Sequence, residues 1–369
     1  MAEVRIPWWM PEVGDSERRL LLEVVDTNFL NDGEYTTRFE KRIAERLGCR
    51  HAVAVTNGTA ALYLALAALD VGPGDEVVVP DVTFIATANA VTMTGATPVL
   101  ADVDASSLNL DPAAFERALT PRTKAVAPVH VSGRGADMPA ITSLAERHGV
   151  AVVEDAAEAL LSKSHGRILG THGAMGCFSF SPNKTITTGQ GGMVVTDDDE
   201  LHVRLRQLKD QGRPVRGTGG DDEHPAVGYN FKLTNLQAAV GLAQLDRIDA
   251  RVERMRGIYR QYAAGLADVE GIAFPGFDLD AGEIPQWVDV VCDRRDELDR
   301  YLAGLGMDCR RFWHALHTTS PYRRSAEAFP VASEDVPRAL WLPSAFTLSE
   351  ADVKEVCAGV RTFYGGAAA

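Results

Sequence analysis

The segment HAVAVTNGTAALYLALAALDVGPGDEVVVP, residues 51–80, decides the fold class of this chain. Its apolar, β-branched run at 51–55 predicts a strand, and the apolar spacing of residues 59–69 predicts a helix. A second β-branched run follows at 76–79 and predicts another strand. Strands that alternate with helices in this way are typical of an α/β fold with a largely parallel central sheet.

The same alternation continues along the first half of the chain. It predicts helices at 87–93 and 140–148, and strands at 98–101, 125–128 and 151–154. In such sheets ligands gather at the carboxyl ends of the strands. We therefore expect the functional residues just after these strands.

The second half of the chain has a different pattern. From Thr234 the apolar spacing predicts one long helix, Asn235 to about Leu266, which leads into a second region. That region contains a predicted strand at 287–291 and predicted helices at 296–305 and 350–364. Since 369 residues exceed one ordinary core, we expect a large α/β domain over residues 1–250 and a smaller α+β domain over 251–369.

Composition and charge exclude several classes of protein. The chain is 46% hydrophobic and 24% charged, as in globular proteins, and its net charge of −14 disfavours nucleic acid or an anionic membrane as partner. Its five cysteines are scattered without CxxC spacing, which predicts reduced thiols in the cytoplasm and neither disulfides nor zinc. There is no signal-peptide core and no apolar run that could cross a bilayer.

The segment FSFSPNKTITTGQGG, residues 178–192, carries the strongest chemical signal. Its lysine, Lys184, follows an aromatic stretch that should be buried and precedes glycines that let the backbone approach a ligand. Asp155 comes at the carboxyl end of the strand predicted at 151–154. A lysine amine and a carboxylate are the pair that pyridoxal 5'-phosphate needs, for the Schiff base and for the ring nitrogen respectively. Without this context Lys184 would be an ordinary surface charge.

Thr56 to Leu62, TNGTAAL, follows a strand and begins a helix. Free N–H groups at a helix amino end suit a phosphate, although Asn57 or Thr59 could equally be a simple helix cap. The chain has no GxGxxG, GxxxxGK[ST] or GxSxG motif. His314 and His317 have no accompanying carboxylate motif, so we expect no metal site.

Several segments resemble those of the DegT/DnrJ/StrS sugar aminotransferases, whose order and spacing they share over nearly the whole chain. Within this family, Glu158 and the run NKTITTG are similar to the branch that aminates GDP-linked keto sugars. The matching segments are TNGTAAL (56–62), GPGDEVVVP (72–80), TFIATANA (83–90), TPRTKA (120–125), EDAAEA (154–159), NKTITTGQGGMVVT (183–196) and GYNFKLTN (228–235).

The resemblance implies the aminotransferase fold type I and a role for each matching residue. Lys184 and Asp155 would be catalytic, the lysine joined to the cofactor and the aspartate on its ring nitrogen. Glu158 would lie beside the phenolic oxygen of the cofactor. The remaining positions implied are Phe84 over the ring, Gly58, Thr59 and Ser179 at the phosphate, Asn230 at the phosphate of the neighbouring subunit, and His317 near the substrate. Asn31, in a segment that departs from the family pattern, and Arg310, in the second region, are further candidates for contact with the substrate.

The resemblance also implies an activity and its partners. The amino donor would be L-glutamate, the cofactor would pass through pyridoxamine 5'-phosphate, and a homodimer would share its active sites. The acceptor would be a GDP-linked keto sugar, but departures from the family pattern at 29–32, 130–133 and 212–225 leave its identity open. A cyclitol or nucleotide-free ketone as acceptor, and a regulatory protein that binds the cofactor without turnover, remain alternatives.

Overall fold

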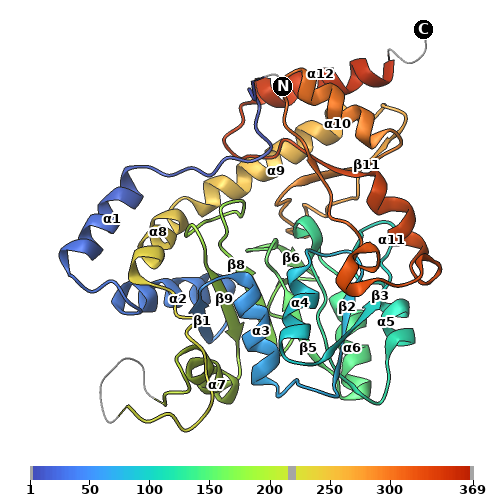
Figure 1. Ribbon diagram of the computed structural model, residues 1–369. Helices are drawn as coiled ribbons and strands as arrows, with labels where there is room; N and C mark the ends of the chain where they lie inside the picture. Colours follow the sequence, from blue (N-terminus) through green and yellow to red (C-terminus); the bar gives the residue numbers. More distant parts are fainter. Residues whose placement is uncertain (1–2, 215–221, 366–369) are drawn as a thin grey trace.

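The computed structural model describes residues 3–214 and 222–365 of the chain (Figure 1). A seven-stranded sheet, in the order β1-β9-β8-β5-β4-β2-β3, forms the centre of the larger body. Neighbouring strands are parallel except that β9 runs antiparallel to both β1 and β8. The strands are β1 (His51–Val55), β2 (Glu76–Pro80), β3 (Thr97–Ala101), β4 (Thr123–Val126), β5 (Ala151–Asp155), β8 (Met175–Ser179) and β9 (Gly192–Thr196).

Helices cover both faces of this sheet, because successive side chains of each strand point to opposite faces. In β1, Ala52 and Ala54 pack on one face, while Val53 and Val55 pack on the other. The first face is covered by α2 (Glu34–Leu47), α5 (Pro112–Ala118), α6 (Met138–His148) and α8 (Asn235–Leu245), and the second by α3 (Gly58–Ala68), α4 (Ala86–Met93) and α7 (Asp199–Lys209). The predicted three-layer α/β/α architecture with a mostly parallel sheet is confirmed.

A smaller sheet, in the order β10-β11-β13-β12, forms the body that most of the last hundred residues build. Its core side chains come from this sheet and from the three helices beside it. The strands are β10 (Ile272–Ala273), β11 (Val288–Cys292), β12 (Arg310–Arg311) and β13 (Ala339–Leu342), and the helices are α9 (Ile248–Gly265), α10 (Arg295–Gly304) and α12 (Glu350–Gly365).

The single helix expected from Asn235 to Leu266 is wrong, because the structure has two helices there. Residues 246–247 interrupt the pattern, and Arg247 leaves the helical region with φ −111° and ψ 3°. Its guanidinium donates to Glu17 in α1 (Asp15–Asp26) at 2.5 Å and reaches the Glu12 carboxylate at 3.1 Å. These bonds fix the break, so α8 packs in the large body while α9 runs up to the small one (Figure 1).

The amino-terminal segment belongs spatially to the small body. Ile6 forms a bridge with Met307, and Arg5 pairs with Glu355 of α12 at 2.6 Å. The expected division at residue 250 falls inside α9, and it remains a prediction.

One edge of the large sheet collects the chain positions marked in the sequence. Asp155 ends β5 and Ser179 ends β8, while Val55 ends β1. Gly192, the first residue of the antiparallel β9, pairs with both Val55 and Ser179. The carboxyl ends of three parallel strands and the start of β9 therefore meet at one place.

Candidate active site

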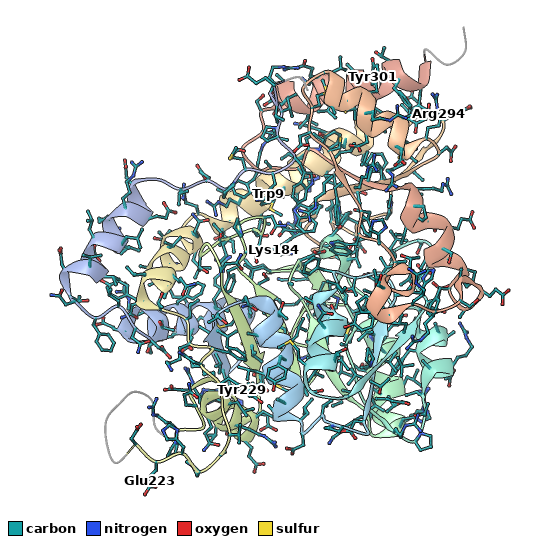
Figure 2. The ribbon with its side chains drawn as sticks, viewed as in Figure 1. Trp9, Lys184, Glu223, Tyr229, Arg294 and Tyr301 are labelled. Atoms are coloured by element: carbon teal, nitrogen blue, oxygen red, sulfur yellow. The ribbon has the colours of Figure 1, made fainter. Side chains whose placement is uncertain are left out.

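A cavity of about 530 Å³ opens at this edge of the sheet. Lys184 lies in it, between the large sheet and the smaller body above (Figure 2). Among the described residues predicted for the site, eight line this cavity: Gly58, Thr59, Phe84, Asp155, Glu158, Ser179, Lys184 and Arg310.

The loop between β8 and β9 holds Lys184. Phe180 is fully buried at its start, and its N–H donates to Gly191 O at 2.8 Å at the end of the loop. On the other side of the lysine, Thr185 is fixed by its N–H and hydroxyl, which both donate to Gln286 Oε1 at 3.1 and 2.5 Å. Lys184 therefore lies in a loop that hydrogen bonds hold in place before and after it.

The Lys184 amine has two neighbours in the cavity. Its Nζ donates to Glu158 Oε1 at 3.2 Å and lies 4.6 Å from the centre of the Trp287 ring. A carboxylate and the face of an indole both attract an ammonium group. The side chain is only 11% exposed, so the amine is shielded from bulk water.

Asp155 lies buried at the floor of the cavity. Burial raises the pKa of its carboxyl group, although the hydrogen bonds that it accepts from the Thr87 hydroxyl and from Ala157 N–H lower it. The Thr87 bond is 2.7 Å long and the Ala157 bond 3.2 Å. A raised pKa means that the present neighbours do not fully compensate the charge, so a cation beside Asp155 would be stabilised.

Glu158 is the second buried acid of the cavity. Its other carboxylate oxygen, Oε2, accepts the N–H of Ser132 at 2.9 Å, within a turn in which Ser132 adopts φ 54°. Burial raises the pKa of Glu158, while Lys184 and the Ser132 N–H lower it and Asp155 raises it further. Both acids thus hold protons more tightly than exposed carboxyl groups do.

The amino end of α3 forms an anion-binding corner. The Asn57 side chain caps Ala60 N–H at 2.8 Å, so Asn57 does act as the helix cap. Within the described part of the chain, the N–H groups of Gly58 and Thr59 have no hydrogen-bond acceptor. A Cβ on Gly58 would lie 3.0 Å from Ser179 Cβ, so glycine keeps room between the helix and that hydroxyl. Free N–H groups and hydroxyls at a helix start suit a phosphate.

Aromatic side chains also line the cavity. Phe84 is 51% exposed although it is large and apolar, and its ring lies 6.5 Å from that of Trp313. An exposed phenylalanine that faces a cavity beside a buried acid provides a surface on which a flat ring can stack.

Three expected site residues do not line this cavity. Asn31 and Asn230 are exposed on the surface. His317 is buried, and it interacts with Asp81 Oδ2 through Nδ1 at 2.6 Å and with Ser333 Oγ through Nε2 at 3.3 Å. In this chain His317 therefore ties its segment to the end of β2.

The sequence did not single out Thr87, Trp287, Trp313 or Ser181 as site residues. Thr87 stands in the quoted TFIATANA segment, a few residues after the strand predicted at 76–79, which was an available signal. Trp287 reaches Lys184 from about 100 residues further along the chain, and no local pattern predicts such a contact. Residues 215–221, within the loop expected to influence the substrate, lie outside the described residues.

The described residues contain no group of three or more histidine, cysteine or acidic side chains that could hold a metal ion. Within the same residues, no helix has the length and apolar character needed to cross a membrane.

A buried lysine and aspartate at the strand ends of this fold are typical of the aminotransferase class. Residues 11–361 match the DegT/DnrJ/EryC1/StrS aminotransferase family. The chain belongs to this family.

Several named proteins are similar to the chain over almost its whole length. The GDP-perosamine synthase of Caulobacter vibrioides is 41% identical, covering 96% of this chain and 97% of that protein. The GDP-perosamine synthase of Vibrio cholerae is 36% identical, over 97% of this chain and 99% of that protein. The spore coat polysaccharide biosynthesis protein SpsC of Bacillus subtilis is 36% identical, over 98% of each.

Solved structures agree in fold. DesV of S. venezuelae, solved in complex with a ketimine intermediate, superposes with a TM-score of 0.90 at 36% identity, over 94% of each chain. A 3-amino-5-hydroxybenzoic acid synthase superposes with a TM-score of 0.92 at 30% identity, over 99% of this chain and all of that one. The expected aminotransferase fold is therefore confirmed.

Proposed function

We propose that this chain transfers the amino group of L-glutamate to a keto sugar linked to GDP, with pyridoxal 5'-phosphate as cofactor. The observation that carries the proposal is the placement of Lys184 and Asp155 in one buried cavity at the strand ends. The GDP-sugar acceptor is inferred from the similarity to two GDP-perosamine synthases.

The cavity has a residue for each part of the cofactor. The N–H groups of Gly58 and Thr59 and the Ser179 hydroxyl would hold its phosphate, and Phe84 would cover its ring. Asp155 would keep the ring nitrogen protonated, because the paired charges relieve the cost of burying the aspartate. When bound, the cofactor supplies an aldehyde that condenses with amines and a ring that withdraws electrons from the adjoining carbon.

Lys184 has two successive roles in this proposal. Its Nζ would hold the cofactor, and as a free amine it would take the proton from the Cα of the amino donor. Glu158, 3.2 Å from this amine and with a raised pKa, would hold a proton beside the phenolic oxygen of the cofactor. Burial of the site keeps bulk water from competing for these protons.

Substitution of Lys184 tests the assignment directly. Lys184→Ala should remove the visible absorption band of the bound cofactor and lower turnover by at least about a thousandfold, since the lysine is both nucleophile and base. In the unmodified protein, L-glutamate should convert the visible band to that of the pyridoxamine form. A protein whose band no amino donor changes would instead be a cofactor-binding regulator, and a band that survives in Lys184→Ala would contradict the role of this lysine.

We also propose a homodimer with shared active sites. Leu22 and Val25 of α1 and the following Phe29 and Leu30 are large apolar side chains that remain exposed, which supports an interface with a second copy. Asn230 is exposed outside the cavity of its own chain, as a residue that serves the neighbouring site would be. All five cysteines are unpaired, which supports a reducing compartment, the cytoplasm.

Mixing two inactive variants tests the sharing of sites. Lys184→Ala dimers and Asn230→Ala dimers should each have low activity, and subunit exchange between them should restore part of it. Restoration would come from the hybrid site in which one chain supplies Lys184 and the other Asn230. Sedimentation should give a dimer for both variants; a monomer, or no recovery in confirmed hybrids, would contradict the proposal.

A further inference from the structure

Two adjacent arginines of β12 have different surroundings. Arg311 lies near α10, where its Nε donates to Asp299 Oδ2 at 2.8 Å and its Nη2 approaches Asp296 Oδ1 at 3.7 Å. Arg310 lines the cavity of the candidate active site instead. Within residues 3–214 and 222–365, no carboxylate lies within ion-pairing distance of Arg310. One arginine is thus neutralised within the fold, and the other is not.

The Arg310 guanidinium is held by aromatic stacking. It lies 4.8 Å from the ring centre of Trp8 and 5.9 Å from that of Trp341. Trp341 is itself fixed, because its buried indole N–H donates to Ser132 Oγ at 3.0 Å. Stacking occupies the flat faces of a guanidinium and leaves its N–H edge available. Arg310 is therefore a positioned cation with unused donors.

The aromatic cluster also connects Arg310 to Lys184. The rings of Trp341 and Trp287 lie 4.9 Å apart, and Lys184 Nζ lies 4.6 Å from the Trp287 ring. Among the described residues that line the cavity, only Lys184 and Arg310 are cationic, and Lys184 is already paired with Glu158. Arg310 is the cavity cation that remains available to a ligand.

We propose that Arg310 is the anion anchor of this cavity and binds an oxyanion of the substrate through its guanidinium edge. The inference rests on the proposed function. The carboxylate of the amino donor and the diphosphate of a nucleotide sugar share this chemistry, since both present paired oxygens that a guanidinium can bind with two hydrogen bonds. Arg310 would thereby hold the substrate from β12 of the smaller body, in the cavity that Gly58 also lines.

Calorimetric titration of the cofactor-loaded protein tests this anchor with two probes. Glutarate presents the carboxylates of glutamate without a reactive amine, and GDP presents the diphosphate. Arg310→Gln should lower the affinity for one or both probes by about 10- to 100-fold, because charge-assisted hydrogen bonds are lost. Arg311→Gln is the matched control, because it removes the same charge one residue away, and it should bind both probes as the unmodified protein does.

The pattern of loss identifies the ligand. If only the affinity for glutarate falls, Arg310 binds the carboxylate of the amino donor. If only the affinity for GDP falls, Arg310 binds the diphosphate. If both affinities fall, the two ligands use the same subsite in turn. If Arg310→Gln does not fold, Arg310→Met keeps the apolar contact with Trp8 and serves in its place. Unchanged affinity for both probes in a folded variant overturns the inference.

This outcome is separable from failure of the proposed function. If no amino donor alters the visible band of the unmodified protein, the proposed transamination fails, while the titrations still measure anion binding at Arg310. If an amino donor alters the visible band but the Arg310 variants bind glutarate and GDP as the unmodified protein does, the proposed transamination stands and only the role proposed for Arg310 is wrong.

Discussion

At the scale of single residues, the cavity brings together two buried acids and an amine that is only slightly exposed. Asp155 and Glu158 both have a raised pKa, chiefly because burial disfavours their charged forms. The two acids differ in their neighbours, since Lys184 donates directly to Glu158 while Thr87 donates to Asp155. The two acids thus differ, because one can share a proton with the amine and the other is held by the Thr87 hydroxyl.

The raised pKa of Glu158 gives a testable dependence of stability on pH. The folded protein holds this proton more tightly than the unfolded chain does, so the contribution of Glu158 is full below its ordinary pKa of 4.5 and is lost as pH rises through the raised value. Compared with Glu158→Gln, the unmodified protein should therefore lose stability upward from pH 4.5, by at most about 1.4 kcal/mol per pH unit. Urea unfolding of the cofactor-free proteins at a series of pH values measures the difference.

A difference between these two proteins that did not vary with pH would mean that Glu158 titrates alike in the folded and unfolded states. The visible band of the cofactor-loaded proteins provides a second measurement. If Glu158 is coupled to the cofactor, its titration should shift the band in the unmodified protein and not in Glu158→Gln.

At the scale of elements, the start of β9 requires glycine at position 192. A Cβ there would lie 2.3 Å from the carbonyl oxygen of Asn57, and Asn57 is the residue that caps α3. Gly192→Ala should push the strand and helix apart at the phosphate corner, reducing cofactor affinity about tenfold or more and unfolding free energy by about 1–3 kcal/mol. Equilibrium titration with pyridoxal 5'-phosphate and urea unfolding measure the two effects.

Gly257 provides the matched control for this substitution. It lies inside α9, and a Cβ there would meet no atom within 4 Å. Gly257→Ala should leave cofactor affinity unchanged and raise the unfolding free energy by about 0.5–1 kcal/mol, because alanine favours the helix. Equal behaviour of the two variants would show that the close contact at Gly192 has no effect on the corner.

Local patterns predicted most elements of the large sheet, because the buried strands are continuous β-branched runs and α3 is almost wholly apolar. They could not predict that β9 lies antiparallel between β1 and β8, since strand order depends on contacts between distant segments. The break between α8 and α9 was missed for a similar reason. Apolar periodicity continues on both sides of it, and the bond from Arg247 to Glu17 that accompanies the break joins segments about 230 residues apart.

Some residues of the candidate site could be predicted from local motifs, and others could not. Lys184, Asp155 and Gly58 stand in local motifs next to strand ends, and the structure places them in one cavity. The Ser132 N–H on Glu158 and the Trp287 ring under Lys184 come from other parts of the chain. Asn31 and Asn230 remain predictions, because a single chain does not bring them to its own cavity.

At the scale of the whole molecule, a buried ion pair joins the two bodies. Arg134, from the large body, donates two hydrogen bonds of 2.8 and 2.6 Å to Asp289 of β11, and both side chains are about 1% exposed. Asp289→Ala would leave a buried guanidinium without its counter-charge, so the unfolding free energy should fall by about 3–5 kcal/mol. The urea midpoint, followed by circular dichroism, measures the loss.

The exposed pair between Asp293 and Arg338 serves as the control. Asp293→Ala should cost less than about 1 kcal/mol, because solvent screens a surface ion pair. If the unfolding free energy fell by less than about 1 kcal/mol in both variants, the Arg134–Asp289 pair would not stabilise the junction of the two bodies.

The first residues of the chain contact segments beside the cavity. Ile6 bridges to Met307, Trp8 stacks under Arg310, and Trp9 donates to Pro182 O two residues before Lys184 (Figure 2). About 300 residues separate the partners of the first contact, and contacts that span so much chain form slowly. During synthesis the amino-terminal tryptophans must wait until the last strands have left the ribosome. The contacts that join the first residues to Met307 and to α12 can therefore form only after nearly the whole chain has been synthesised.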